Sequence, residues 1–166
     1  MTTTPKACWF CGAGLTGATT SKEHVFPQWL QKELGLAALP ITPTWHAEPL
    51  GELLDERNQT WGNLVAGRIC KACNNGWMSE LETVAMPVLL PLVRGERDVR
   101  QLTPQGARKV AAWAVKTVLT LSAAVQEKRA PLAHYQALHG DPAAVPAGIY
   151  VFATQREGIV ARPLHD

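Results

Sequence analysis

The sequence predicts an α+β protein with a metal-stapled first half and a mainly helical second half. Three observations lead to this prediction: two CxxC pairs, a long stretch of helical apolar periodicity over residues 104–127, and two short strand-like segments near the C-terminus. A charged connector, residues 94–101, separates the halves. We therefore expect a zinc-binding core over 1–93 and a helical appendage with a terminal hairpin over 94–166, whose role the sequence does not indicate.

Length and composition describe an ordinary globular chain. The protein has 166 residues, of which 46% are hydrophobic and 18% are charged, so extensive disorder is excluded. The formal net charge is only +2 at pH 7. This charge is too small to identify nucleic acid as a partner, and it does not exclude one.

We expect neither a membrane span nor secretion. The longest apolar stretches are 84–93, which contains two prolines, and 110–125, which contains Lys116. The first six residues, MTTTPK, include no apolar segment of the kind that a secretory signal needs. A cytoplasmic location follows as the default expectation.

The four cysteines are the most informative feature of the sequence. They form two pairs, Cys8-Trp-Phe-Cys11 and Cys70-Lys-Ala-Cys73. Four thiolates suit the tetrahedral coordination of a structural zinc ion, and each CxxC pair can contribute two ligands from one tight turn. A redox pair would need only one CxxC. The cysteine pattern therefore predicts a structural zinc site, with an unusually long segment inserted between its two halves.

The segments of the first half can be assigned in order. Residues 23–26 are extended, and Pro27 introduces a short helix over 28–34 that Gly35 ends. Residues 36–50, with three prolines, indicate a loop, and 51–57 indicate a helical turn or two. Residues 60–69 are expected to form a strand that leads into the second cysteine pair. A helix over about 75–86 follows, and Pro87 is expected to end or kink it.

In the second half, Thr103-Pro104 is a favourable start for the helix over 104–127. Residues 131–138 predict a second, short helix. Residues 149–153 and 159–163 predict the terminal hairpin.

Two polar clusters lie close to the cysteine pairs in the sequence. The first is Glu23-His24, three residues before Pro27, in which neighbouring side chains of an extended segment face opposite ways. One of them could bind a metal ion while the other contacts a water molecule. The second is Asn74-Asn75, directly after Cys73. An Asn carbonyl oxygen is a hard ligand suited to Mg²⁺ or Mn²⁺, but these residues could also simply cap the helix.

Together, the order CxxC, E-H-x-x-P, strand, CxxC-N-N resembles the HNH endonuclease family, the ββα-metal nucleases, over about residues 8–82. The resemblance implies an HNH-type core and hydrolysis of phosphodiester bonds, with DNA as the expected partner. The pattern after the second cysteine pair resembles a bacterial or phage subgroup of that family.

The resemblance also implies roles for individual residues. His24 would be the general base that activates water, and Glu23 and Asn74 would hold the catalytic divalent ion, Mg²⁺ or Mn²⁺. Asn63 or Asn58 would orient the histidine. The chain departs from the commoner family pattern at Glu23, where Asp is usual, and at Asn74, where His is usual.

Two alternatives of a different class stay open. The chain could be a non-catalytic module with an HNH-like fold that binds nucleic acid or protein, or a purely structural zinc domain of a larger assembly.

Trp45 and Trp61 could stack on bases, although packing is the simpler role for both. A basic run could contact phosphates or act only as a charged connector; it comprises Arg94, Arg97, Arg100, Arg108 and Lys109. Oligomeric state, sequence specificity and biological role are not predicted.

Overall fold

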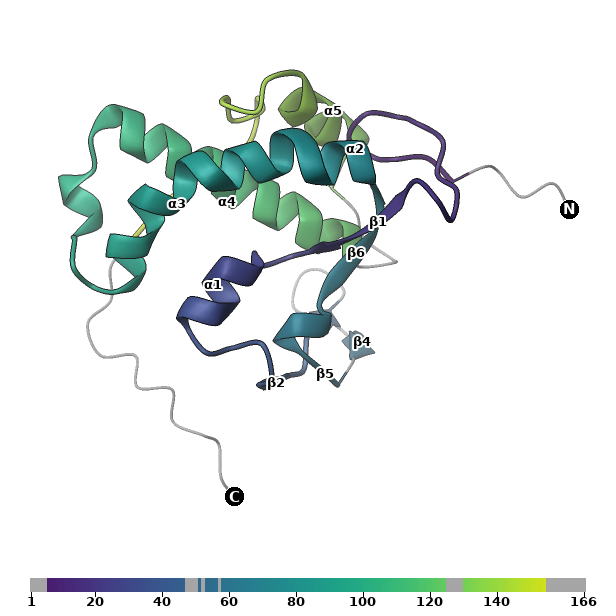
Figure 1. Ribbon diagram of the computed structural model, residues 1–166, viewed down its shortest axis with the longest axis horizontal. Helices are drawn as coiled ribbons and strands as arrows, with labels where there is room; N and C mark the ends of the chain where they lie inside the picture. Colours follow the sequence, from purple (N-terminus) through teal and green to yellow (C-terminus); the bar gives the residue numbers. More distant parts are fainter. Residues whose placement is uncertain (1–5, 47–50, 52, 57, 125–129, 155–166) are drawn as a thin grey trace, which may run out of the picture.

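The computed structural model describes residues 6–46, 51, 53–56, 58–124 and 130–154 of the chain. Helices and strands are mixed along the sequence, which confirms the α+β class. A central pair of antiparallel strands lies beside a group of helices, and a small lobe of short strands lies on the other side (Figure 1). Among the described residues, no helix combines the length and apolar character needed to cross a membrane.

The central pair consists of β1 (Thr20–His24) and β6 (Val65–Cys70). Thr20 pairs with Cys70 and His24 pairs with Val65, with an irregularity in register between Ser21 and Glu23. Because side chains alternate along a strand, Ser21 and Glu23 are both buried, whereas Lys22 is exposed. This pairing joins the segment after the first cysteine pair to the strand that carries Cys70.

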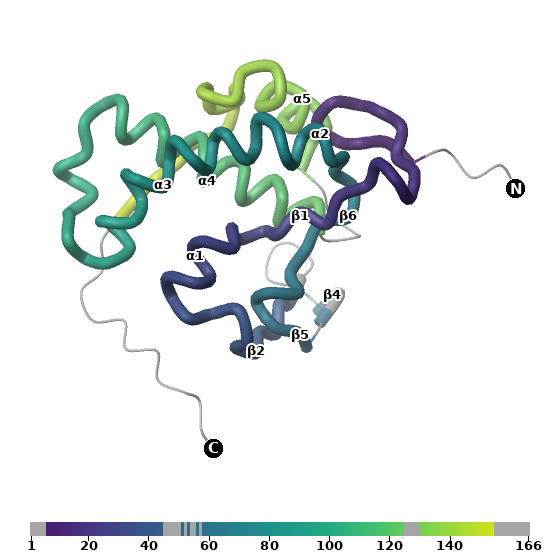
Figure 2. Tube along the Cα trace, viewed as in Figure 1, coloured from purple at the N-terminus to yellow at the C-terminus, as the bar shows by residue number. Residues whose placement is uncertain are grey.

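The lobe between β1 and β6 begins with the short helix α1 (Gln28–Glu33) after Pro27, as predicted. Two further antiparallel pairs follow: β2 (Pro40–Ile41) with β5 (Gln59–Thr60), and β3 (Thr44–His46) with β4 (Leu53–Glu56). A 3₁₀ turn, η1 (Trp61–Asn63), leads into β6. Figure 2 shows α1, β2 and β5 grouped together on one side of the central strands.

A longer stretch of helical structure begins at the end of β6. It consists, in chain order, of α2 (Lys71–Cys73), the π-helical segment η2 (Asn74–Met78) and α3 (Ser79–Val93). After the 3₁₀ turn η3 (Val99–Gln101), the long helix α4 (Pro104–Ala124) begins at Pro104 as predicted. The short helix α5 (Leu132–Gly140) confirms the predicted helix near 131–138.

One hydrophobic core joins both halves of the chain. Helix α4 contacts both α3 and β6. Phe10 and Ile69 from the first half pack in the same buried cluster as Leu119 and Tyr135 from the second half. The segments expected to be a core and an appendage therefore both contribute to the same buried apolar cluster.

Four local predictions were wrong. The predicted loop over 36–50 contains the short strands β2 and β3. Residues 53–56 form a strand and not a helical turn, because they pair with 44–46. The predicted strand over 60–69 is interrupted by η1. Residues 149–153 have no regular secondary structure, and the other predicted strand of the hairpin, 159–163, lies outside the described residues.

Helix α3 also differs from its prediction, because it continues through Pro87 and Pro91. Its buried residues Leu81, Ala85 and Leu89 recur every four positions and keep one face against the interior. Pro87 lies on the exposed face, where water can hydrate the carbonyl that the missing N–H leaves without a helical partner. Packing of the buried stripe thus outweighs the effect of the prolines.

Candidate metal centre and adjacent polar cavity

The four cysteines come together at the end of the central strand pair. Their sulfur atoms all lie within 4.8 Å of one another. The Sγ–Sγ distance is 3.9 Å between Cys8 and Cys73 and 3.6 Å between Cys11 and Cys70. Four sulfurs at about 2.3 Å from a tetrahedral ion would be about 3.8 Å apart, and disulfide sulfurs would be near 2 Å. The cluster therefore fits a metal ion and excludes disulfide bonds in this structure.

Local backbone structure explains how each pair presents its sulfurs. The first pair lies in a tight turn that the hydrogen bond from Gly12 N–H to the Cys8 carbonyl closes, and Gly12 has the left-handed φ of 76°. At the second pair, Asn74 instead has a right-handed helical φ of −60°. The backbone N–H of Cys73 donates to the Cys70 Sγ at 3.4 Å, and that of Cys70 donates to the Cys8 Sγ at 3.4 Å.

The surroundings of the sulfurs shift their acidity in different directions. Burial raises the pKa of the Cys73 thiol far above its usual range, although the nearby Trp77 indole opposes this shift. Burial also raises the pKa of Cys11. At Cys70 the effect of burial is outweighed by hydrogen bonds from the Cys73 backbone and neighbouring thiols, so its pKa is lowered. A bound cation would stabilise all four as thiolates.

A polar cavity of about 310 Å³ lies beside this cluster. Its lining side chains all carry oxygen atoms, and they come from β1, η2 and α3: Glu23, Asn74, Asn75, Ser79 and Glu82. Glu23 and Asn74, the two residues implied as divalent-ion ligands, thus share one cavity. The donor set suits a hard cation such as Mg²⁺ or Mn²⁺.

A hydrogen bond joins the segment that carries Asn74 to strand β1, which carries Glu23. The side-chain amide of Asn74 donates to the hydroxyl of the buried Ser21, two residues before Glu23 on β1. Asn74 directly follows the metal-cluster residue Cys73. The hydrogen bond therefore fixes the orientation of the Asn74 amide relative to the strand that carries Glu23.

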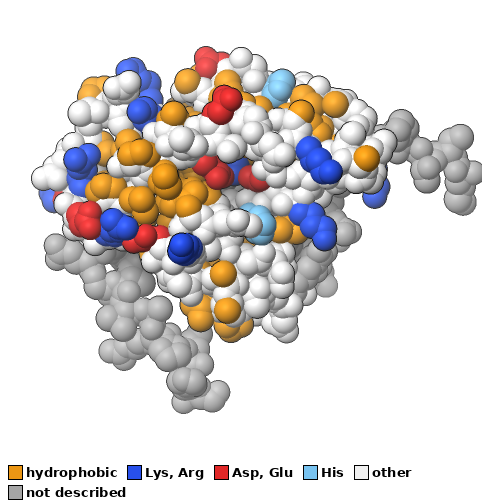
Figure 3. All heavy atoms as spheres, in the orientation of Figure 1, with side chains coloured by type: hydrophobic (Ala, Val, Ile, Leu, Met, Phe, Trp, Pro, Cys, Tyr) orange, Lys and Arg blue, Asp and Glu red, His pale blue; other side chains and the backbone are white. Residues whose placement is uncertain are grey.

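Two of the residues that line the cavity, Glu23 and Glu82, belong to a buried ion-paired triad with Lys116. Lys116 Nζ on α4 lies 2.5 Å from Glu23 Oε1 and 2.6 Å from Glu82 Oε1. The Lys116 side chain is 0% exposed, against 8% for Glu23 and 20% for Glu82. Burial raises the pKa of Glu23, and the charge and hydrogen bond of Lys116 act in the opposite direction. In Figure 3, acidic and basic side chains gather near the middle of the face shown.

His24 occupies the last position of β1 and is partly buried. It is next to Glu23 in sequence but does not line the 310 Å³ cavity, since adjacent strand residues face opposite sides. Asn63 lies in η1 with an exposed side chain. Asn58 accepts a hydrogen bond from the Thr42 hydroxyl at 2.8 Å. Neither asparagine lines the cavity.

Sequence reasoning missed Glu82 and Lys116. A signal for Lys116 was present, because it lies within the buried face of α4, flanked by Ala112, Val115 and Leu119. A lysine at such a position requires anionic partners. No comparable local signal marks Glu82, which is one of several acidic residues near the start of α3.

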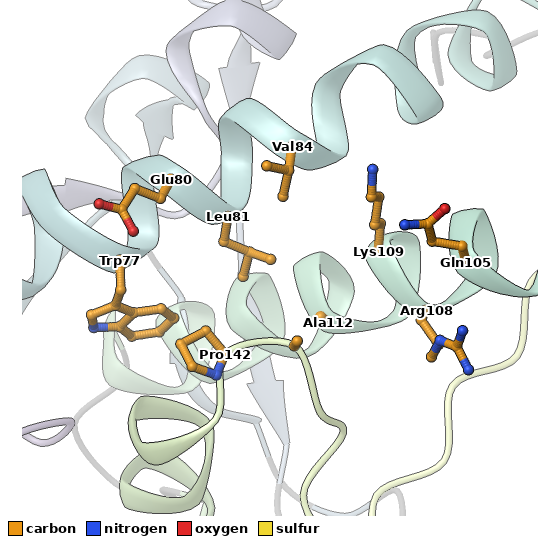
Figure 4. A pocket seen from close by; sticks show the side chains of 10 residues that line it. Trp77, Glu80, Leu81, Val84, Gln105, Arg108, Lys109, Ala112 and Pro142 are labelled. Carbon is orange, nitrogen blue, oxygen red and sulfur yellow. The ribbon is translucent and has the colours of Figure 1, made fainter.

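A second cavity, of about 450 Å³, lies between α3 and α4 (Figure 4). Trp77 lies at one end, Leu81, Ala112 and Pro142 lie at its centre, and Arg108 and Lys109 lie toward the other end. Two other arginines of the basic run form ion pairs outside this cavity: Arg94 contacts Glu33 at 2.6 Å and Arg100 contacts Asp98 at 2.5 Å.

Comparison with protein-family models, with curated proteins and with solved structures finds no significant match to this chain.

Proposed function

We propose that this chain is a metal-dependent endonuclease of the HNH type that hydrolyses phosphodiester bonds, with DNA as its substrate. The observation that carries the proposal is the shared cavity of Glu23 and Asn74, next to four clustered cysteines. The β1–β6 pair followed by α2, η2 and α3 also gives the strand–strand–helix order that the sequence resemblance implies.

The four cysteines would hold a structural zinc ion. Four thiolates in tetrahedral arrangement are typical of such sites, which leave no position open for a substrate. The zinc would fix the start of α2 to the loop that carries Cys8 and Cys11. This attachment holds Asn74 close to β1, where its amide contacts Ser21.

Glu23 and Asn74 would hold a separate Mg²⁺ or Mn²⁺ ion, with Glu82, Asn75 and Ser79 as further oxygen donors on the same cavity. When bound, such an ion stabilises negative charge on a scissile phosphate and on the leaving oxygen. The buried position of Glu23 strengthens its interaction with a cation, because little water screens it.

His24 would act as the general base from the end of β1, next to Glu23 in the chain and outside the set of residues that line the cavity. Its imidazole nitrogen accepts a proton from a water molecule while the water oxygen bonds to phosphorus and the P–O3′ bond breaks. The leaving 3′-oxygen then takes a proton from solvent. General base catalysis of this kind typically contributes about 10²–10⁴-fold to the rate.

A second candidate function is a non-catalytic zinc module that binds nucleic acid. The observation in its favour is the cavity between α3 and α4, where Trp77 offers an aromatic face and Arg108 and Lys109 offer positive charge. The two functions differ in their need for the cavity that holds Glu23.

A plasmid-cleavage assay with Glu23→Gln separates them. The wild-type protein, loaded with zinc, is expected to nick DNA only when Mg²⁺ or Mn²⁺ is added, and Glu23→Gln is expected to lose this activity while keeping its zinc. If the wild-type protein binds DNA but cleaves neither DNA nor RNA with any divalent ion, the nuclease proposal is wrong and the binding module is favoured.

A further inference from the structure

Lys116 lies behind the two carboxylates of the polar cavity. Its ammonium contacts Glu23 and Glu82 at 2.5 and 2.6 Å, and its side chain is completely buried. Both glutamates line the cavity, whereas Lys116 does not. The ammonium is therefore on the protein side of the carboxylate pair, and α4 supplies a fixed positive charge to a cavity built by β1, η2 and α3.

This arrangement sets the charge of the cavity. Two ionised carboxylates carry two negative charges, and the lysine offsets one of them. A bound divalent cation would leave the group with one net positive charge, which complements the single negative charge of a phosphodiester. Without the lysine, the same loaded group would be neutral and would lose this attraction.

We propose that Lys116 is a positioning residue that holds Glu23 and Glu82 side by side and keeps the cation-loaded site positively charged toward its phosphodiester substrate. Glu82 is then the second carboxylate of the site. This inference rests on the proposed function, since it assigns residues to the same hydrolytic site. It also gives α4, in the second half of the chain, a role in that site.

Binding of Mn²⁺ alone tests the charge assignment without any need for cleavage. The zinc-loaded proteins to compare are the wild type, Lys116→Met, Glu82→Gln and the double variant, with free Mn²⁺ followed by electron paramagnetic resonance. Each unit of buried charge near the ion is expected to change the Mn²⁺ dissociation constant by about tenfold or more. Lys116→Met should bind Mn²⁺ more tightly than the wild type, and Glu82→Gln more weakly. The double variant should recover most of the affinity that Glu82→Gln loses.

Cleavage provides the second measurement. At saturating Mn²⁺, Lys116→Met should show a higher KM for DNA than the wild type, although it binds the metal more tightly. Lys116→Arg, which keeps the charge, should stay closer to the wild type. A residue needed only for folding would not change metal affinity and substrate affinity in opposite directions.

The outcomes separate the charge-setting role of Lys116 from the nuclease function. If folded, zinc-loaded Lys116→Met binds Mn²⁺ no more tightly than the wild type, the charge-setting role is overturned while the nuclease proposal stands. If Lys116→Met does not fold, the Mn²⁺ affinities of Glu82→Gln and the double variant test the charge-setting role instead. Equal Mn²⁺ affinities of these two variants would overturn it. If the wild type itself binds no Mn²⁺, the proposed divalent-ion site fails and this inference fails with it.

Discussion

Lys116 and Glu23 are 93 positions apart in the sequence, and their ammonium and carboxylate groups lie 2.5 Å apart in the structure. This ion pair joins α4 to β1 inside the molecule, where neither side chain is well exposed to water. Breaking a buried pair by removing one partner leaves an uncompensated charge. Through this contact, α4 in the second half of the chain supplies the positive charge that stabilises Glu23 at the polar cavity.

From this contact we expect Lys116→Met to lower the free energy of unfolding by about 3–5 kcal/mol. Urea denaturation of the zinc-loaded protein measures the change. Lys109→Met is the matched control, because Lys109 is on the same helix but is only partly buried at the rim of a cavity. Its expected effect is within about 0.5 kcal/mol. Equal effects of the two substitutions would show that the Glu23–Lys116 pair does not contribute as described.

Removal of the metal from the four-cysteine cluster should unfold much of the protein. The apparent free energy of zinc binding in zinc-finger peptides is roughly 10–16 kcal/mol. This is comparable to, or larger than, the whole free energy of unfolding of a domain. Circular dichroism during titration with a zinc chelator should show loss of helix, and added zinc should restore it. Cys70→Ser should purify with little zinc. A helical, cooperatively folding protein without metal would contradict this role for the cluster.

The hydrogen bond between Asn74 and Ser21 should affect divalent-ion binding but not zinc binding. Ser21→Ala removes the acceptor that orients the Asn74 amide. A hydrogen bond contributes about 0.5–1.5 kcal/mol net, so we expect Mn²⁺ affinity to fall about two- to tenfold. Isothermal titration calorimetry on the zinc-loaded protein measures it. Thr83→Ala, which removes an exposed hydroxyl that bonds the Ser79 carbonyl, is the control and should leave Mn²⁺ affinity unchanged.

Pro87 is expected to destabilise the helix that contains it. Pro87→Ala would supply the N–H that the interior of α3 lacks, and should raise the free energy of unfolding by about 1–3 kcal/mol. Pro104→Ala is the control, because Pro104 is the first residue of α4, where no helical N–H partner is lost. Thermal unfolding followed by circular dichroism compares them. A gain for Pro104→Ala equal to that for Pro87→Ala would contradict this explanation.

The sequence predicted those parts of the fold that depend on local chemistry. The spacing of Cys8, Cys11, Cys70 and Cys73 indicated one cluster, and the structure confirms that these residues could together hold a metal ion. The start of α4 at Pro104 follows from the preference of proline for the first turn of a helix. In both cases the residues that determine the feature are close together in the chain or belong to a known ligand pattern.

The remaining features depend on contacts between distant residues. The strand at 53–56 forms because it pairs with 44–46, and helix α3 passes Pro87 because a buried stripe holds it in place. Glu82 joins Glu23 only because α3 and α4 pack so that Lys116 meets both carboxylates. No short pattern in the sequence specifies such a meeting of three segments.

The most direct test of the nuclease proposal is plasmid cleavage by zinc-loaded His24→Ala with added Mn²⁺, beside the wild type and His134→Ala, a substitution on α5 outside the site. We predict that the wild type and His134→Ala nick DNA at similar rates and that His24→Ala loses at least about a hundredfold in rate. Equal cleavage by His24→Ala and the wild type would contradict the assignment of His24 as the general base.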